Sequence, residues 1–347
     1  MTPAGLDRSG AIFPLLPLRG GPLGPRLRKW PCDRDRIGLS CGASIFPALA
    51  ASRRAARATA PRKALRQKPD RALLRSLLPL IRRWPGPGSL CAMERPIVVV
   101  GLGEMGGVFA RAFLSVGYPV YPALRHTSME DAATTVPDPA LVLVTVGEAD
   151  LDETLDGLPA MWRPRVGLIQ NELLPRDWMR HGIADPTVAS VWFEKKPGTP
   201  VKVIVPTLVA GPQAELVATA LDRLGVAAKV IPRDELVDAL VAKNLYILTA
   251  NIGGMQTGGT VSELWNGHPE LAGPVAAEVL DIQEHLVGEP LDRERAMDAM
   301  VTAFDADPDH GATGRSAPRR LERALRFARS AGIATPALEA IAEKVEQ

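Results

Sequence analysis

Residues 101–106, Gly-Leu-Gly-Glu-Met-Gly, have the glycine spacing of a turn that binds a dinucleotide. A β-branched run, Ile97–Val100, precedes the turn, and an apolar segment containing alanines follows it. This is the strand–turn–helix order that such a site requires, with the phosphates bound by free N–H groups at the start of the helix. We therefore predict that a dinucleotide is bound by Gly101, Leu102, Gly103, Glu104, Met105 and Gly106.

The residue after the second predicted strand, 118–124, bears on which dinucleotide is bound. Folds that bind NAD usually carry Asp or Glu about 20 residues after the glycines, where the carboxylate holds the ribose 2′-hydroxyl. Here Arg125 stands at that place, and the first carboxylate after it is Glu130. A guanidinium can bind a 2′-phosphate through paired hydrogen bonds, although an arginine exposed to solvent needs no such role. We favour NADP over NAD as the cofactor.

A lysine within a long apolar helical pattern is the second feature that suggests chemistry. Segment 234–251 is predicted to be a helix that breaks at the Gly-Gly pair 253–254, and it carries Lys243, Asn244 and Asn251. The two asparagines are seven residues apart and lie on one stripe of this helix. An apolar environment makes a lysine a better acid near neutral pH, so Lys243 could protonate a substrate oxygen that an asparagine orients. The alternative is a lysine whose stem packs in the core while its amine reaches water.

The elements that position these residues change in type near residue 232. Up to that point, strand patterns alternate with helical ones, at 141–146, 166–169, 188–193, 201–205 and 228–231. Such alternation indicates a parallel sheet with helices on both faces, in which ligands bind beyond the carboxyl ends of the strands. Asn171 follows one of these strands, so we expect it to contact the cofactor.

Helical patterns dominate the rest of the chain, at 233–251, 274–286, 292–304, 319–331 and 336–346. We therefore expect an α/β fold in which an N-terminal Rossmann domain that binds NADP, 93–232, precedes an all-helical domain, 233–347. The helical domain would serve substrate binding and dimerisation, with the apolar stretch 274–286 as the candidate surface of a homodimer. No apolar run is long enough to suggest a transmembrane segment.

Residues 1–92 differ in composition from the remainder. They hold 18 of the 41 Lys and Arg residues, four of the 39 Asp and Glu residues, and all three cysteines. Such a basic, Pro- and Arg-rich segment cannot bury enough apolar surface to offset its ordering entropy, which predicts a disordered extension. We interpret it as the product of a start placed too early, with Met93 as the true beginning; a targeting peptide or a nucleic-acid-binding tail are alternatives. The acidic remainder without cysteine indicates a cytoplasmic enzyme with no nucleic-acid or membrane partner.

The segment 93–347 resembles the ketopantoate reductase family, and more distantly the 6-phosphogluconate and β-hydroxyacid dehydrogenases. The resemblance rests on the glycine turn with Arg125, the strand end Gln170-Asn171, Lys243 with Asn251 eight residues later, and segments 313–315 and 332–336. It implies reduction of a 2-oxo acid with NADPH, with Lys243 as general acid and asparagines that position the substrate.

The resemblance is weaker at the residues that would contact substrate. The family's first asparagine after the lysine falls on Ile247, its lysine after the third strand falls on Gly147, and Glu172 replaces the glycine of Gln-Asn-Gly. The serine and glutamate that bracket the substrate have no clear match in 305–320. The cofactor residues are therefore better preserved than the substrate residues.

His310 and Arg315 are the candidate substitutes for these missing groups, together with Asn244. His310 could hydrogen-bond a carbonyl or carboxylate or simply be solvated, and Arg315 could hold a carboxylate or pair with Glu322. No grouping of residues has the spacing of a metal site, and hydride transfer needs no metal.

Three functions remain open at this level. The favoured one is a reductase of a small 2-oxo acid or related carbonyl compound that uses NADPH. The others are a sensor or scaffold protein that binds NADP without catalysis, and an imine or amino-acid reductase on the same scaffold.

Overall fold

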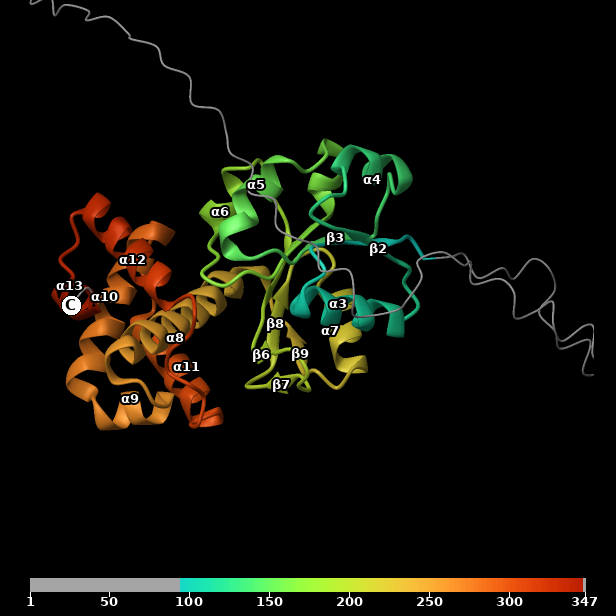
Figure 1. Cartoon of the computed structure of the whole chain (residues 1–347). Helices are drawn as coiled ribbons and strands as arrows, with labels where there is room; N and C mark the ends of the chain where they lie inside the picture. Colours follow the sequence, from blue (N-terminus) through green and yellow to red (C-terminus); the bar gives the residue numbers. More distant parts are fainter. Residues whose placement is uncertain (1–93, 346–347) are drawn as a thin grey trace, which may run out of the picture. The chain divides into compact units, whose positions relative to one another are not determined.

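A seven-stranded sheet forms the first part of the structure, a computed structural model that describes residues 94–345 (Figure 1). The expectations for residues 1–92 lie outside this range. The strand order is β2-β1-β3-β4-β5-β8-β9. The strands are β1 (Ile97–Val100), β2 (Val120–Ala123), β3 (Leu141–Val144), β4 (Val166–Leu168), β5 (Thr187–Ser190), β8 (Thr207–Ala210) and β9 (Ala228–Val230).

Strands β1, β3 and β4 are apolar and buried along their whole length because helices cover both faces of the sheet. In β1, Val98 and Val100 belong to one apolar core, whereas Ile97 and Val99 belong to the other. The side of Ile97 and Val99 is covered by α3 (Glu104–Ser115) and α7 (Ala214–Arg223). The opposite side is covered by α4 (Met129–Thr135), α5 (Leu151–Asp156), α6 (Pro175–Met179) and the 3₁₀ segment η2 (Ala160–Arg165). Figure 1 shows α4, α5 and α6 above the sheet, with α3 and α7 below it.

The prediction of a parallel sheet is right for β1 to β5 and wrong for β8. Strand β8 pairs antiparallel with β5, and β9 then pairs parallel with β8. The strand predicted at 188–193 is present as β5 in the main sheet, although it ends at Ser190. The strand predicted at 201–205 is not part of that sheet: β6 (Phe193–Glu194) and β7 (Lys202–Val203) form a separate two-stranded antiparallel sheet. Residues 191–206, which join β5 to β8, form this hairpin and no crossover helix, so β8 runs antiparallel to β5.

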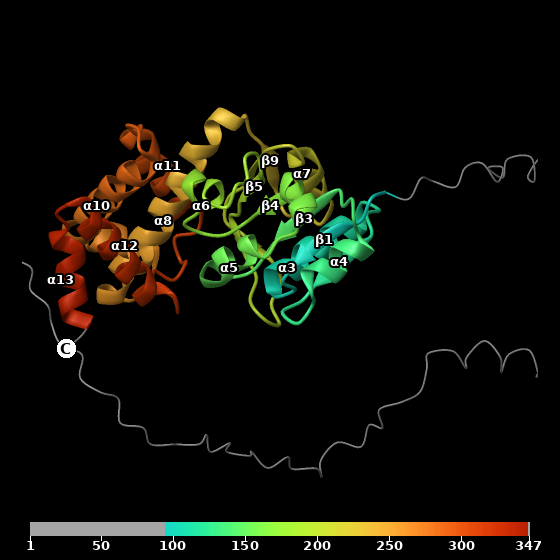
Figure 2. The same cartoon turned by 90° about the horizontal axis from the view of Figure 1, so that it is seen from above.

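Helix α8 (Leu236–Thr257) is the centre of the second, helical part. It packs against α9 (Val261–Gly267), α10 (Pro269–Val287), α11 (Arg293–Ala306), α12 (Ala317–Ala331) and α13 (Pro336–Val345). These helices surround α8, as Figures 1 and 2 show, and this is why its sequence is apolar on nearly all sides. The α/β fold class followed by helices is confirmed.

The Gly-Gly pair 253–254 does not end α8, contrary to the prediction. The helix continues to Thr257 and stops at Gly258, whose φ is 65°. A Cβ on Gly254 would lie 2.6 Å from the backbone of Ala312, and one on Gly253 would lie 3.0 Å from Leu264. The pair is therefore needed for close packing of the chain against this helix.

The apolar stretch 274–286 is not a free surface, so its assignment as the dimer face is wrong. Its apolar side chains, including Val275, Val279 and Ile282, are buried inside the helical part. They form the contact of α10 with α8. Within residues 94–345, no helix is long and apolar enough to cross a membrane.

Candidate functional site

The glycine turn between β1 and α3 requires glycine at two positions for reasons internal to the fold. Gly101 has a φ of 85°, and its N–H donates to the carbonyl of Ala123 at 2.9 Å. A Cβ on Gly106 would overlap the carbonyl of Gly101 and the hydroxyl of Thr145. The Thr145 hydroxyl itself donates to the carbonyls of Val100 and Gly101, which holds the turn against β3.

Gly103 is different, because nothing lies within 4 Å of where its Cβ would be. It precedes α3, whose first turn has no side-chain cap, so the N–H groups there are left for a ligand. The space beside it is a cavity of about 740 Å³, lined by the turn and by the carboxyl ends of β1, β2 and β3. From β1 the chain continues to β2 on one side and then crosses to β3 on the other side of β1. The cavity lies at this reversal of strand order, which is where open α/β sheets bind ligands. The shape and the free donors fit a dinucleotide.

Arg125 lies on the rim of this cleft at the end of β2. Its side chain is 92% exposed, and its nearest carboxylate is Asp150, 3.7 Å away. The guanidinium is therefore available to a charged group at the end of the cleft, with Asp150 as its competitor.

A second cavity, of about 360 Å³, adjoins the first. The two share Thr145, Val146 and Gly147 in their walls. Met105 and Lys195 line the second cavity, and the Lys195 amine lies 3.0 Å from the carboxylate of Glu104. The rest of its lining includes Asn171 and Lys243.

Lys243 is the titratable group that the fold perturbs most at this site. The residue is 9% exposed, its amine donates to the carbonyl of Val191, and the amine lies 4.5 Å from the centre of the Trp192 ring. Burial, together with the positive charge of Arg320, lowers the pKa of Lys243 to about 7. A lysine with this pKa holds a proton that it can donate near neutral pH.

Gln170 and Asn171 brace the wall between the two cavities. The Gln170 amide donates to the carbonyls of Val144 and Val146, at 2.9 and 3.1 Å, and so holds the chain that leaves β3. The Asn171 amide donates to Glu148 at 3.0 Å. Asn171 lines the second cavity together with Met105.

Sequence reasoning missed Arg320 as part of the site. This buried arginine on α12 donates to Glu172 at 2.8 Å, to the side-chain oxygen of Asn251, and to Glu148 at 3.4 Å. Nothing in the pattern of α12 separates Arg320 from the four other arginines on that helix. A clue existed in Glu172, which stands where the resemblance expects glycine.

Glu172 has a φ of 60°, a conformation that favours glycine. Its carboxylate receives hydrogen bonds from Arg320 and from Arg323, the latter at 3.0 Å. These charge-assisted bonds offset the backbone strain, and they join the end of β4 to α12. Among the described residues, Glu172 has the only positive φ outside glycine.

The structure does not bring Asn244, His310 and Arg315 to Lys243. Asn244 is 1% exposed and donates to Gln283 at 2.9 Å, away from the cavity. His310 pairs with Asp307 at 3.3 Å, and Arg315 is exposed. None of the three lines either cavity of the site, and Asn251, whose oxygen is bound by Arg320, does not line them either. Residues 94–345 contain no cluster of His, Cys, Asp and Glu that could hold a metal ion.

Comparison with known proteins identifies the fold. No family model matches the sequence, and no curated protein matches it either. A 2-dehydropantoate 2-reductase from Methylococcus capsulatus is similar in structure, with a TM-score of 0.55 at 14% identity, over 72% of this chain and 96% of that one. The chain has the ketopantoate reductase fold.

Two further structures with the ketopantoate reductase fold agree. A PanE/ApbA family ketopantoate reductase from Ralstonia eutropha matches with a TM-score of 0.50 at 18% identity, over 72% of this chain and 97% of that one. A dimeric ketopantoate reductase from Staphylococcus aureus matches with a TM-score of 0.52 at 16% identity, with the same coverage. The match therefore spans nearly the whole length of each ketopantoate reductase, including its helical part.

Proposed function

We propose that this chain is an NADPH-dependent reductase of a small 2-oxo acid or related carbonyl compound, with Lys243 as the general acid. One observation carries the proposal. A buried lysine with a pKa of about 7 lines a cavity that adjoins the cleft at the glycine turn. A proton donor thus lies next to a site whose shape and donors fit a dinucleotide.

Each residue of the site has one task in this proposal. The N–H groups at Gly103 and the first turn of α3 bind the pyrophosphate, Arg125 binds the 2′-phosphate, and Asn171 orients the cofactor. When bound, NADPH supplies the hydride. Lys243 donates a proton to the substrate oxygen, and the neutral amine that remains is stable because the site is buried. Asn251, held by Arg320, positions the substrate.

The decisive experiment is NADPH oxidation by the purified chain with a panel of 2-oxo acids of increasing length. Turnover of at least one member, abolished in Lys243→Met, is the expected result. NADPH binding without turnover of any member would reject the reductase.

A second candidate, a protein that binds NADP without catalysis, is favoured by the hydrogen bonds of the two asparagines. The oxygen of Asn251 is taken by Arg320, and the amide of Asn171 is taken by Glu148. One group of each side chain is thus already engaged within the chain. The same panel of 2-oxo acids distinguishes the two functions. Adding cyclic imines to the panel tests whether the chain is an imine reductase.

The specificity for NADPH is expected to depend on Arg125. Loss of a charged hydrogen bond costs about 1.5–3 kcal/mol, so Arg125→Asp should weaken NADPH binding by about tenfold or more and leave NADH binding nearly unchanged. Calorimetric titration with both cofactors measures this. Asp150→Asn, which removes the competing carboxylate, should strengthen NADPH binding, and Arg223→Asp on the exposed end of α7 is the control for net charge. Equal affinity of the unmodified protein for the two cofactors would contradict the assignment.

We also propose that the chain forms a homodimer in the cytoplasm. The dimer is suggested by the dimeric ketopantoate reductase with the same fold, and the location by the acidic composition of 93–347 without cysteine. Because 274–286 is buried, another face must form the contact. A single species of monomer mass in sedimentation at micromolar concentration would exclude the dimer.

A further inference from the structure

Lys195 lines the second cavity but has no part in the proposed reaction. It follows β6 in the β6–β7 hairpin, and the hairpin packs on α3 through Phe193, whose ring centre lies 6.0 Å from that of Phe109. This contact fixes the hairpin beside α3. The Lys195 side chain is 13% exposed, so the fold holds its amine in the wall of the cavity and not in bulk solvent.

The start of α3 lies where the cleft of the glycine turn and the second cavity adjoin. Gly103, which caps α3, lines the cleft, and Met105 lines the second cavity. Glu104 stands between them in the sequence, and its carboxylate is the group that the Lys195 amine meets at 3.0 Å. The amine therefore reaches the first turn of α3 from the hairpin. The N–H groups of this turn are those that the proposed function assigns to the pyrophosphate.

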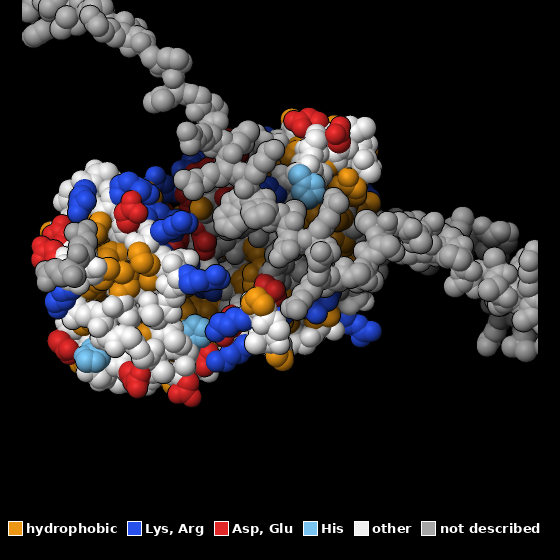
Figure 3. All heavy atoms as spheres, in the orientation of Figure 1, with side chains coloured by type: hydrophobic (Ala, Val, Ile, Leu, Met, Phe, Trp, Pro, Cys, Tyr) orange, Lys and Arg blue, Asp and Glu red, His pale blue; other side chains and the backbone are white. Residues whose placement is uncertain are grey.

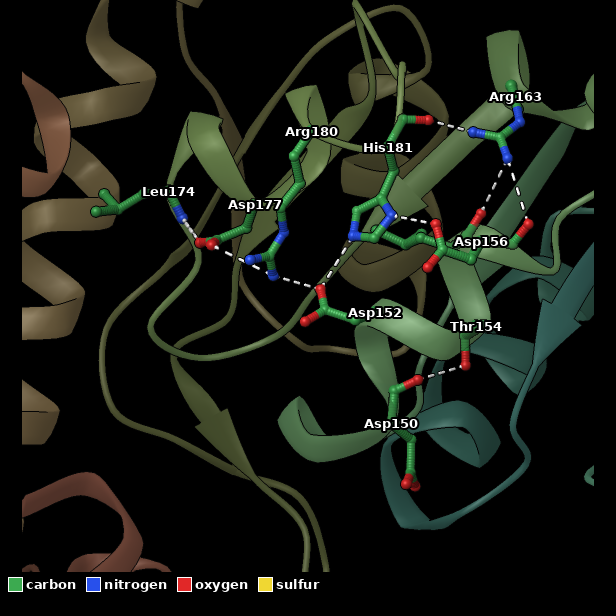
Figure 4. Close-up of polar contacts among 10 residues, drawn as sticks. Asp150, Asp152, Thr154, Asp156, Arg163, Leu174, Asp177, Arg180 and His181 are labelled. Atoms are coloured by element: carbon green, nitrogen blue, oxygen red, sulfur yellow. Dashed lines mark hydrogen bonds and ion pairs between the residues drawn. The ribbon is translucent and has the colours of Figure 1, made fainter. Parts of the chain in front are cut away.

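Two of the acidic side chains on α5 are neutralised by residues that follow α6. Figure 4 shows that Asp152 contacts Arg180 and His181, and that Asp156 contacts His181 at 2.7 Å. Asp150 points away from this cluster and lines the cleft of the glycine turn. A ligand in the cleft therefore meets the carboxylate of Asp150, whereas those of Asp152 and Asp156 are already paired.

Glu104 adds a second negative charge, at the place where a dinucleotide would put its pyrophosphate. The helix dipole favours a carboxylate in the first turn of α3, but this carboxylate repels another anion bound there. On the face that Figure 3 draws, Lys and Arg side chains of the helical part stand among Asp and Glu side chains, so the surface there does not supply a field of one sign. The positive charge that offsets Glu104 comes from Lys195, with which it forms an ion pair.

We propose that Lys195 is a further cofactor-binding residue, whose ammonium group lies between the Glu104 carboxylate and the pyrophosphate of the bound dinucleotide and donates to both. An ammonium group has three N–H donors, and Lys195 donates one of them to the carbonyl of Lys196 at 2.7 Å. The other two suffice for the carboxylate and a phosphate oxygen. The inference rests on the proposed function only in taking the cleft as a dinucleotide site. It requires neither the 2′-phosphate nor Lys243.

Calorimetric titration of the full chain with NADPH and NADH tests this role. Lys195→Met should weaken binding of both by about tenfold or more, because both carry the pyrophosphate, whereas Arg125→Asp should affect NADPH alone. Adenosine 2′-monophosphate, which has no pyrophosphate, should bind equally to Lys195→Met and to the unmodified chain. Lys196→Met is the matched control, since this neighbouring side chain is 68% exposed and lines neither cavity.

Glu104→Gln distinguishes a binding role from a purely structural ion pair. It breaks the same pair as Lys195→Met, but it removes the charge that competes with the pyrophosphate. It should therefore strengthen binding of both cofactors by about two- to fivefold, the effect of one charge near a helix N-terminus. Added to Lys195→Met, it should restore part of the lost affinity. Melting temperatures close to that of the unmodified chain show that the variants fold.

Three results would overturn the role of Lys195. They are equal cofactor affinity of Lys195→Met and the unmodified chain, equal weakening by Lys195→Met and Glu104→Gln, and weaker binding of adenosine 2′-monophosphate to Lys195→Met. If neither NADPH nor NADH bound to the unmodified chain, the dinucleotide site itself would be rejected, and the role of Lys195 with it. Binding without turnover of any 2-oxo acid would reject only the reductase, because these titrations need no turnover.

Discussion

Replacing Lys243 by methionine is expected to lower kcat by about 10²- to 10⁴-fold, the usual contribution of general acid catalysis. NADPH binding should persist, because the lysine lines the second cavity and not the cleft of the glycine turn. Steady-state kinetics on the best substrate of the panel, with NADPH affinity measured separately, checks both statements. Lys229→Met, an exposed lysine on β9, is the control. A variant that reduces carbonyl compounds at the original rate would show that Lys243 is only a packed lysine.

The rate should also depend on pH in a direction set by the pKa of Lys243. The protonated amine is the acid, so the rate of reduction should be constant at low pH and fall as pH rises through about 7. The reverse oxidation needs the neutral amine as base and should rise over the same range. In the methionine variant this titration should disappear from the residual activity.

The same substitution is expected to stabilise the fold below neutral pH. The pKa of Lys243 is about 7 in the folded chain, against the ordinary 10.5, so the unfolded chain binds the proton more tightly. The contribution of Lys243 to stability is therefore least favourable below pH 7 and becomes more favourable between pH 7 and 10.5. The full cost of the buried charge is at most about 4–5 kcal/mol, and the bond to the Val191 carbonyl recovers part of it. Lys243→Met should raise the free energy of unfolding by roughly 1–3 kcal/mol at pH 6 and by less at pH 10. Denaturant titration at the two pH values checks this, and a destabilised variant at pH 6 would contradict it.

Gly103→Val is expected to abolish binding of NADPH and NADH alike while the fold remains intact. Gly103 has a φ of −76°, which valine adopts freely, and nothing lies within 4 Å of its Cβ position. The new side chain would occupy the place of the pyrophosphate at the start of α3, so affinity should fall by about 100-fold or more. Calorimetric titration measures the loss, and the melting temperature should not change.

Gly106→Val provides the contrast to this substitution. Its Cβ would overlap the carbonyl of Gly101 and the hydroxyl of Thr145, so this variant should lose stability as well as cofactor binding. If Gly103→Val bound NADPH like the unmodified protein, the open space at this turn would not be the cofactor site.

The sequence by itself determined the features that depend on near neighbours. Glycine spacing at 101–106 specified a turn with one left-handed residue and one close approach, and fully apolar runs specified strands covered on both faces. The apolar residues around Lys243 left a buried amine and an amine that reaches water as alternatives; the structure buries the lysine, and burial lowers its pKa. These properties are local because spacing and periodicity act within a few turns of chain.

Tertiary structure alone decided which residues share a wall with the site. Arg320 lies 148 positions from Glu172, and its burial depends on how α12 meets the end of β4. The Gly-Gly pair 253–254 suggested a helix end, but the close approach of Ala312 and Leu264 gives it a packing role inside α8. The apolar face at 274–286 suggested a partner chain, but α8 of the same chain covers it. For the glycine pair and the apolar face, the residue types indicated close packing. Only contacts between segments far apart in the sequence determined which residues pack against them.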